Sequence, residues 1–312
     1  MFQDVLRIIK AEYMRVRHRM FFYIVPLTAL LFVILPILRA YHFAITLHTR
    51  SWVGYPGSLP PPGLGEDLST LLYWFKWGNL PTASGAGLLA GLGIVLFLYV
   101  GAVWFGDDLS CGAIKQSAIL RVKFRHITWG KVLALMLYTA GTIIFVVAGA
   151  VLMTVFLPEV PGRELRSFLH LTLWRNLFLY IAMAFLWTFF AAAITVMTRS
   201  MPTSMAASTL WVMAERELLE NGQSGWQLFM AKVTPWSTCQ SLLASVYDRF
   251  SWMENAPNWI TWVTTPPYTK TLENGDMTPY LLSFSLLLIL LLVYLLAALM
   301  VVVRGYYWRG KE

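Results

Sequence analysis

The feature that most constrains this chain is a series of long apolar stretches without charge. Five stretches, each of about 20 residues or more, contain no Asp, Glu, Lys, Arg or His: residues 20–38, 86–105, 132–157, 176–197 and 280–303. A bilayer core of about 30 Å requires about 20 helical residues, and a helix satisfies its own backbone hydrogen bonds where water is absent. Each stretch is therefore predicted to cross a membrane as a helix.

Composition excludes a soluble or disordered protein, and a sixth apolar stretch completes the expected set of spans. The chain is 58% hydrophobic and only 13% charged, which is incompatible with a water-soluble globule or a disordered chain. Residues 201–214 are apolar but short, and Glu215, Arg216 and Glu217 follow them, so this stretch crosses only if it continues to residue 219 or if the bilayer thins locally. We therefore expect an all-α polytopic membrane protein, with six transmembrane helices in one transmembrane domain over residues 1–312.

The distribution of basic residues predicts the orientation. With the N-terminus in the cytoplasm, the cytoplasmic stretches hold 14 of the 24 Lys and Arg residues and 5 of the 16 acids, a balance of 14 − 5 = +9. The other face then carries 10 − 11 = −1. Both termini are expected in the cytoplasm, and the net charge of +8 is a topology signal that gives no indication of nucleic acid binding.

The segments outside the spans carry further expectations. Leu6, Ile9, Tyr13, Val16 and Met20 recur at helical spacing among basic residues, which predicts an amphipathic helix on the anionic inner leaflet. A plain positive-inside anchor is the alternative, and either way the first span is expected to be uncleaved. The outer segments are residues 39–85 and 215–279, and the second includes an apolar run, 241–246, that is too short to cross and is a candidate re-entrant helix.

Three pairs of residues in or near the spans lead to separate hypotheses. Glu215 and Glu217 directly follow the short fifth span and are interpreted as an outer gate or as the start of the re-entrant helix. Gly87 and Gly91 form a G-x-x-x-G pair that favours a close approach of two helices. The two cysteines, Cys111 and Cys239, are expected on opposite faces and therefore unpaired.

Several kinds of chemistry find no support in the sequence. The predicted spans contain no ionisable residue to bind a coupling ion, and the chain has no G-x-x-x-x-G-K-[ST] phosphate-binding motif. There is no H-E-x-x-H pattern or Cys/His cluster, and Ser84 has no histidine base within a span, so it is better explained as a helix N-cap. We expect no enzyme, no metal and no cofactor on this chain.

The predicted cytoplasmic loop, residues 107–131, is the most informative segment. Its acids come first and its bases follow, which predicts a short exposed helix that a partner could bind. The loop has an acid at Asp108, then Gly112 and Lys115, then Leu120 and Arg125 before Gly130-Lys131 at the next span. This pattern resembles the permeases of ABC-type-2 exporters, although the usual Glu is Asp108 here and the usual Thr is Ala113.

The resemblance implies a transport subunit in the bacterial cytoplasmic membrane that works with two separate ATP-binding subunits and a second permease copy or a homologous permease. ATP would bind on the partner. The residues implied to contact the ATPase are Asp108, Gly112, Lys115, Arg121, Arg125 and Lys131, although topology alone also accounts for the bases. Charge-free spans favour an amphiphilic cargo, such as a peptide antibiotic, drug, lipid or glycan. The alternative is a non-transporting scaffold or sensor that binds a ligand through its outer segments.

Overall fold

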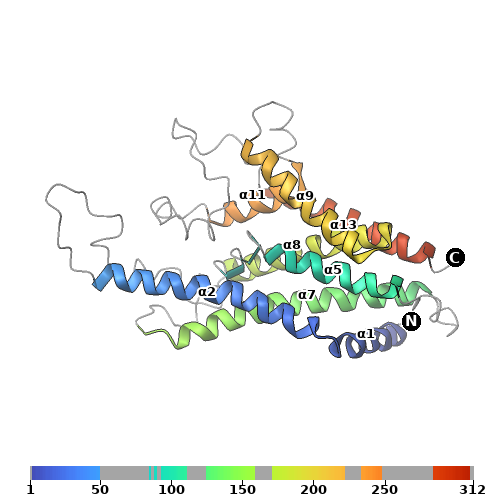
Figure 1. Ribbon diagram of the computed structural model, residues 1–312, viewed down its shortest axis with the longest axis horizontal. Helices are drawn as coiled ribbons and strands as arrows, with labels where there is room; N and C mark the ends of the chain where they lie inside the picture. Colours follow the sequence, from blue (N-terminus) through green and yellow to red (C-terminus); the bar gives the residue numbers. More distant parts are fainter. Residues whose placement is uncertain are drawn as a thin grey trace.

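The computed structural model of the chain describes residues 2–49, 84–85, 88–89, 93–110, 124–158, 171–221, 233–247 and 284–309 (Figure 1). Within these residues the fold is all-helical and contains no strand, which confirms the predicted all-α class. The helices are α1 (Phe2–Arg17), α2 (Phe21–Thr49), α5 (Gly93–Ser110), α7 (Phe124–Val155), α8 (Leu171–Thr198), α9 (Met201–Asn221), α11 (Pro235–Tyr247) and α13 (Phe284–Arg309).

Four helices of the described chain are long and apolar enough to cross a membrane. The segments are Phe21–Arg39 of α2, His126–Val155 of α7, Leu173–Thr198 of α8 and Ser285–Tyr306 of α13. They match four of the predicted spans and give the chain the character of a multi-pass membrane protein. The apolar part of α5, Gly93–Asp107, is shorter, and α9 is helical but does not reach the same apolar character.

Several helices extend beyond the predicted spans, because hydropathy marks where a helix is apolar and not where it ends. α2 continues to Thr49, so residues 39–49 of the expected outer segment are helical. α5 runs to Ser110 and α7 begins at Phe124, so both flanks of the predicted 107–131 loop belong to long helices. The exposed short helix expected inside that loop falls on residues 111–123, outside the described residues. α9 passes through Glu215 and Glu217 to Asn221, so no helix begins at these acids.

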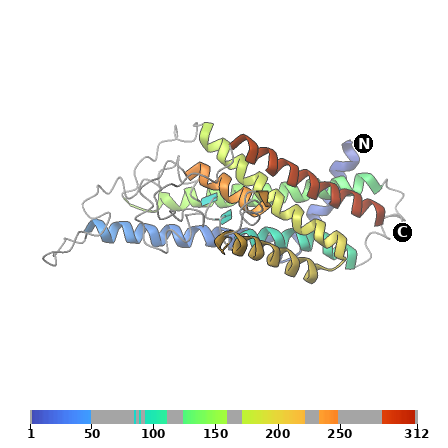
Figure 2. The ribbon, with the colours of Figure 1, turned by 90° about the horizontal axis from the view of Figure 1, so that it is seen from above.

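The helices form an elongated bundle in which α8 is central (Figures 1 and 2). α8 packs against α5, α7, α9 and α13, and 61% of its membrane-length segment is buried, compared with 22% for α2 and α13. On the outward faces of α2 and α13, large apolar side chains such as Leu27, Leu35, Leu292 and Leu296 are exposed. An apolar solvent around the bundle is required to cover them.

Gly101 permits the tightest contact of the central helix. A Cβ placed on Gly101 would lie 2.9 Å from the carbonyl carbon of Thr188 and 3.1 Å from the backbone nitrogen of Ala192, with the Thr188 oxygen closer still. Only glycine therefore allows the backbones of α5 and α8 to approach this closely. Gly87 and Gly91, where the sequence predicted a close approach, lie outside the described residues.

Tyr138 of α7 compensates for a proline in α2. Pro26 has no N–H, so the carbonyl of Phe22, four residues earlier, loses its helical donor. The Tyr138 hydroxyl donates to the Phe22 oxygen at 3.2 Å and lies 3.4 Å from the Phe21 oxygen. The rings of Phe22 and Trp104 also pack on Tyr138, with centroids 5.1 and 5.5 Å away. These contacts fix the first turns of α2 against α7 and α5.

Both termini lie at the same end of the bundle (Figures 1 and 2). This end, called the α1 end below, also holds α1, the last turns of α5 and α13 and the first turns of α7. The connection from α8 to α9 is there too: Arg199 adopts a left-handed conformation with φ of 59°, and Met201 packs near Gly106 of α5. The α1 end is therefore the place where segments distant in sequence meet.

Candidate functional site

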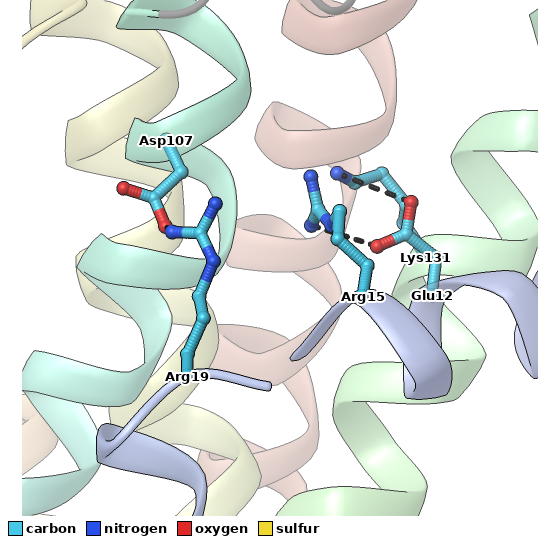
Figure 3. Close-up of polar contacts among 5 residues, drawn as sticks. All are labelled: Glu12, Arg15, Arg19, Asp107 and Lys131. Carbon is cyan, nitrogen blue, oxygen red and sulfur yellow. Dashed lines mark ion pairs between the residues drawn. The ribbon is translucent and has the colours of Figure 1, made fainter. Parts of the chain in front are cut away.

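Five charged residues from α1, α5, α7 and the link between α1 and α2 gather at the α1 end (Figure 3). We call them the α1 cluster: Glu12, Arg15, Arg19, Asp107 and Lys131. Nη2 of Arg15 lies 2.7 Å from Oε2 of Glu12, and Nζ of Lys131 lies 3.5 Å from Oε1 of the same carboxylate. Arg19 pairs with Asp107 in a second ion pair. Glu12 therefore bridges a cation of its own helix and a cation of α7.

Lys131 is the most deeply buried member of the cluster. Its side chain is 0% exposed, and its Nζ lies 5.6 Å from the ring centroid of Tyr306 on α13 and 5.9 Å from that of Phe105 on α5. The ammonium thus has aromatic faces on two sides and a carboxylate on a third, which offset part of its desolvation. The prediction of an exposed loop position for Lys131 was wrong, because α7 begins before it and α1 covers it.

The carboxyl group of Glu12 depends on its partners for its charge. Burial raises the pKa of the Glu12 carboxyl, while the nearby Arg15 and Arg19 guanidinium groups lower it. Removing a cation from a buried pair leaves the remaining charge uncompensated, which costs more than the pair itself contributes. The Glu12 carboxylate is thus a group whose state is sensitive to the positions of α1 and α7.

The second ion pair lies where the chain turns from α1 into α2. Arg19 occupies a three-residue link, and its amide donates to the Val16 carbonyl at 2.9 Å, which keeps the link compact. Its guanidinium reaches Asp107 in the last turn of α5. Both side chains are partly exposed, so solvent screens this pair more than it screens the Glu12–Lys131 pair.

The apolar residues of α1 divide between two environments. Val16 is buried and Ile9 packs against the core, while Ile8 lies so close to Gly130 that a Cβ on Gly130 would be 2.8 Å from the Ile8 Cβ. Three of the residues in the predicted apolar stripe instead face outward: Leu6 and Tyr13 are about half exposed, and Met20 is 80% exposed. Residues 2–17 are helical. The side of this helix that includes Ile8 and Glu12 makes its closest contact with the bundle.

The structure describes only part of the predicted ATPase-contact set. Asp108 lies in the last turn of α5, Arg125 is the second residue of α7, and Lys131 is buried as described above. Gly112, Lys115 and Arg121 lie outside the described residues. Sequence reasoning missed Glu12, Arg19 and Asp107 as members of a site. The available signal was that Glu12 is an isolated acid among the bases of residues 7–19.

Glu215 has a structural role that its sequence position did not reveal. It is 4% exposed, its Oε2 accepts a 2.7 Å hydrogen bond from the backbone N–H of Trp236, and its Oε1 accepts one from the Trp211 indole. The carboxylate therefore caps the N-terminus of α11, where the helix dipole favours a negative charge. Glu217 is exposed, so the two acids of the predicted gate face different environments.

α11 is a helix of 13 residues, too short to cross a bilayer, and the side chains of residues 236–240, 242 and 243 are buried. It packs against α9 and α13, it buries Trp236 and Leu243, and the hydroxyl of Tyr294 on α13 donates to the Val233 carbonyl just before it. Cys239 on this helix is a buried free thiol, whereas Cys111 lies outside the described residues. In the described part of the chain, no three His, Cys, Asp or Glu side chains lie together as a metal site requires.

Comparison with known proteins assigns no relative. The chain matches no protein-family model and is not significantly similar to any curated protein sequence.

Proposed function

We propose that the chain is the permease subunit of an ATP-driven exporter, which moves an amphiphilic substrate across a bacterial cytoplasmic membrane. The observation that carries the proposal is the arrangement at the α1 end. Both termini, the cationic helix α1 and the two helix ends that flank residues 111–123 lie together there. The sequence of this flanked segment resembles the ATPase-contact loop of ABC-type-2 permeases.

In this proposal α5 and α9 complete a set of six spans, and the α1 end faces the cytoplasm. The termini at one end require an even number of crossings, and the excess of basic residues selects the cytoplasm for that end. The half-exposed apolar residues Leu6, Tyr13 and Met14 of α1, together with its bases, suit a helix that rests on the anionic inner leaflet.

The chain itself has no nucleotide-binding motif, so the proposal assigns ATP hydrolysis to two separate subunits. A second permease copy, or a homologous permease, would supply the other half of the translocation path. ATP hydrolysis can drive transport only if the ATP-bound and ATP-free partners bind residues 107–131 differently. We expect Asp108→Lys or Arg125→Glu to reduce transport per ATP hydrolysed while the variant chain still inserts. Unchanged transport per ATP would remove both residues from the coupling role.

Isolation of the tagged chain from native membranes tests the proposal. We expect an ATPase with a phosphate-binding motif to copurify in a stoichiometric amount, and we expect Asp108→Lys to reduce its yield. A matched control is Glu217→Lys, which places the same change on an exposed residue elsewhere on the chain and should leave the yield unchanged. Recovery of the chain with no ATPase would favour the alternative, a non-transporting scaffold or sensor that binds a ligand through its outer segments.

A further inference from the structure

α1 lies across the ends of the two helices that flank residues 111–123. On one side, Arg19 pairs with Asp107, three residues before the end of α5 at Ser110. On the other side, Glu12 pairs with Lys131 in the second turn of α7, and Ile8 packs on Gly130. Figure 3 shows the two ion pairs side by side, each joining the α1 region to a different helix.

The two attachments differ in strength. The α7 attachment is buried and sterically close: Lys131 is fully enclosed, and Gly130 has no room for a side chain beneath Ile8. The ion pair that joins the α1 region to α5 is partly exposed. A displacement of α7 relative to α5 should therefore carry α1 with α7 and open the Arg19–Asp107 pair first.

The link to α2 is short enough to transmit such a displacement. Only residues 18–20 separate α1 from α2, and backbone hydrogen bonds cross this link at Arg19, Phe22 and Tyr23, with donor–acceptor distances of 2.9, 3.1 and 3.1 Å. Val16, in the last turn of α1, is buried in the same apolar core as Phe21 and Val25 of α2. α1 and the start of α2 thus have little freedom to move apart.

We propose that α1 is a brace that joins the start of α7 to the start of α2, with Glu12 and Lys131 as its positioning residues. A displacement of α7 relative to α5 then moves α1 with α7, and the movement reaches α2. Lys131, which the family resemblance places among the ATPase-contact residues, acts through α1 in this proposal, because its side chain is fully enclosed. The placement of α1 can be tested on the isolated chain, whereas its effect on transport rests on the proposed function.

A cysteine pair tests the placement. In a chain with Cys111→Ser and Cys239→Ala, we expect Ile8→Cys with Gly130→Cys to form an intrachain disulfide when an oxidant is added. Ile8→Cys removes Cγ2, the atom of residue 8 nearest to position 130, and the two Cβ atoms then need to separate by only roughly 1 Å to reach the Cβ–Cβ distance of about 3.5–4.5 Å found in disulfides. Oxidation should protect both thiols from a maleimide reagent. The control pair, Leu6→Cys with Gly130→Cys in a chain that also carries Ile8→Ala, removes the same Ile8 Cγ2 contact, uses a half-exposed residue of the same helix and should remain reactive. Equal reactivity of the two pairs would overturn the brace.

Charge variants test the positioning role. In hydrogen–deuterium exchange of the isolated chain, Glu12→Gln and Lys131→Met should each increase exchange of residues 5–16, and the double variant should increase it by less than the sum of the two. Arg7→Gln, a matched change on the exposed side of α1, should leave exchange unchanged. Additive effects of Glu12→Gln and Lys131→Met would remove the pair from the proposal.

Transport per ATP hydrolysed, measured on the complex of the chain with its ATPase, distinguishes a brace from a contact that only stabilises the fold. Glu12→Gln should lower transport per ATP hydrolysed more than it lowers hydrolysis, and the 8–130 disulfide introduced into the Glu12→Gln chain should restore the ratio. A ratio unchanged by Glu12→Gln, or not restored by the disulfide, would overturn the brace and leave the permease assignment standing. Absence of any ATPase would instead remove the proposed function and leave the disulfide result decisive for the placement of α1.

Discussion

The contact between α5 and α8 at Gly101 gives the sharpest test of the fold. An alanine Cβ at this position would lie 2.9 Å from the Thr188 carbonyl carbon, whereas carbon atoms in contact are normally about 3.5–4.0 Å apart. The two helices must therefore separate by roughly 0.6 Å or more. Overpacking of this kind costs about 1–3 kcal/mol, against a gain of about 0.5–1 kcal/mol from replacing a helical glycine. The difference between this cost and this gain predicts that Gly101→Ala is destabilising by up to about 2.5 kcal/mol.

Gly141 provides a matched control, because the same substitution there meets open space. Among the residues that the structure describes, no atom outside the backbone of α7 itself and the two neighbouring residues lies within 4 Å of a Cβ on Gly141, which is also in the middle of a long helix. Gly141→Ala should therefore raise stability by about 0.5–1 kcal/mol. Thermal unfolding of the purified chain in one detergent measures both variants, with a shift of about 2–4 °C for each kcal/mol. An equal or higher melting temperature for Gly101→Ala than for Gly141→Ala would refute the close approach of α5 and α8.

Three further predictions address separate parts of the molecule. Tyr138→Phe should lower the free energy of unfolding by about 1–2 kcal/mol, because the Phe22 carbonyl loses its hydrogen-bond donor. This loss of stability should be smaller in a Pro26→Ala chain, where the alanine N–H restores the helical donor; an equal loss in both chains would contradict the compensation. Glu215→Gln should lower the free energy of unfolding by about 1.5–3 kcal/mol, because the amide carries no negative charge and has only one acceptor oxygen for the N–H groups of Trp236 and Trp211. The same change at the exposed Glu217 should stay within about 0.5 kcal/mol, and equal effects would refute the cap. A single cysteine at position 58 should react with an impermeant thiol reagent from outside whole cells, and its protection would reverse the proposed topology.

The apolar helices could be predicted from sequence because the physical requirement behind them is local. A run without charge that must satisfy its backbone in lipid has one regular solution, so α2, α7, α8 and α13 appear where the hydropathy places them. Their ends do not follow from the same reasoning. α7 includes residues 124–131, ahead of the predicted span at 132–157, because Arg125 and Lys131 interrupt an apolar run without interrupting a helix.

The α1 cluster could not be predicted from the sequence, for a different reason. Hydropathy treats Lys131 as a surface residue, and its burial requires the rings of Phe105 and Tyr306 and the carboxylate of Glu12, which come from three other helices. Glu215 is a similar case, since its partner is a backbone N–H of α11. A buried charge can be recognised only when its tertiary partners are known, because those partners alone offset its desolvation.

The central claim is that ATP binding and hydrolysis on a separate subunit drive transport through this chain. The most direct measurement is ATP hydrolysis and cargo movement in liposomes that contain the chain purified from native membranes, first with its copurifying partner and then after the partner has been stripped away. The account predicts ATP-dependent movement with the partner present, and neither hydrolysis nor movement without it. Nucleotide hydrolysis or cargo movement by the stripped chain would contradict the account.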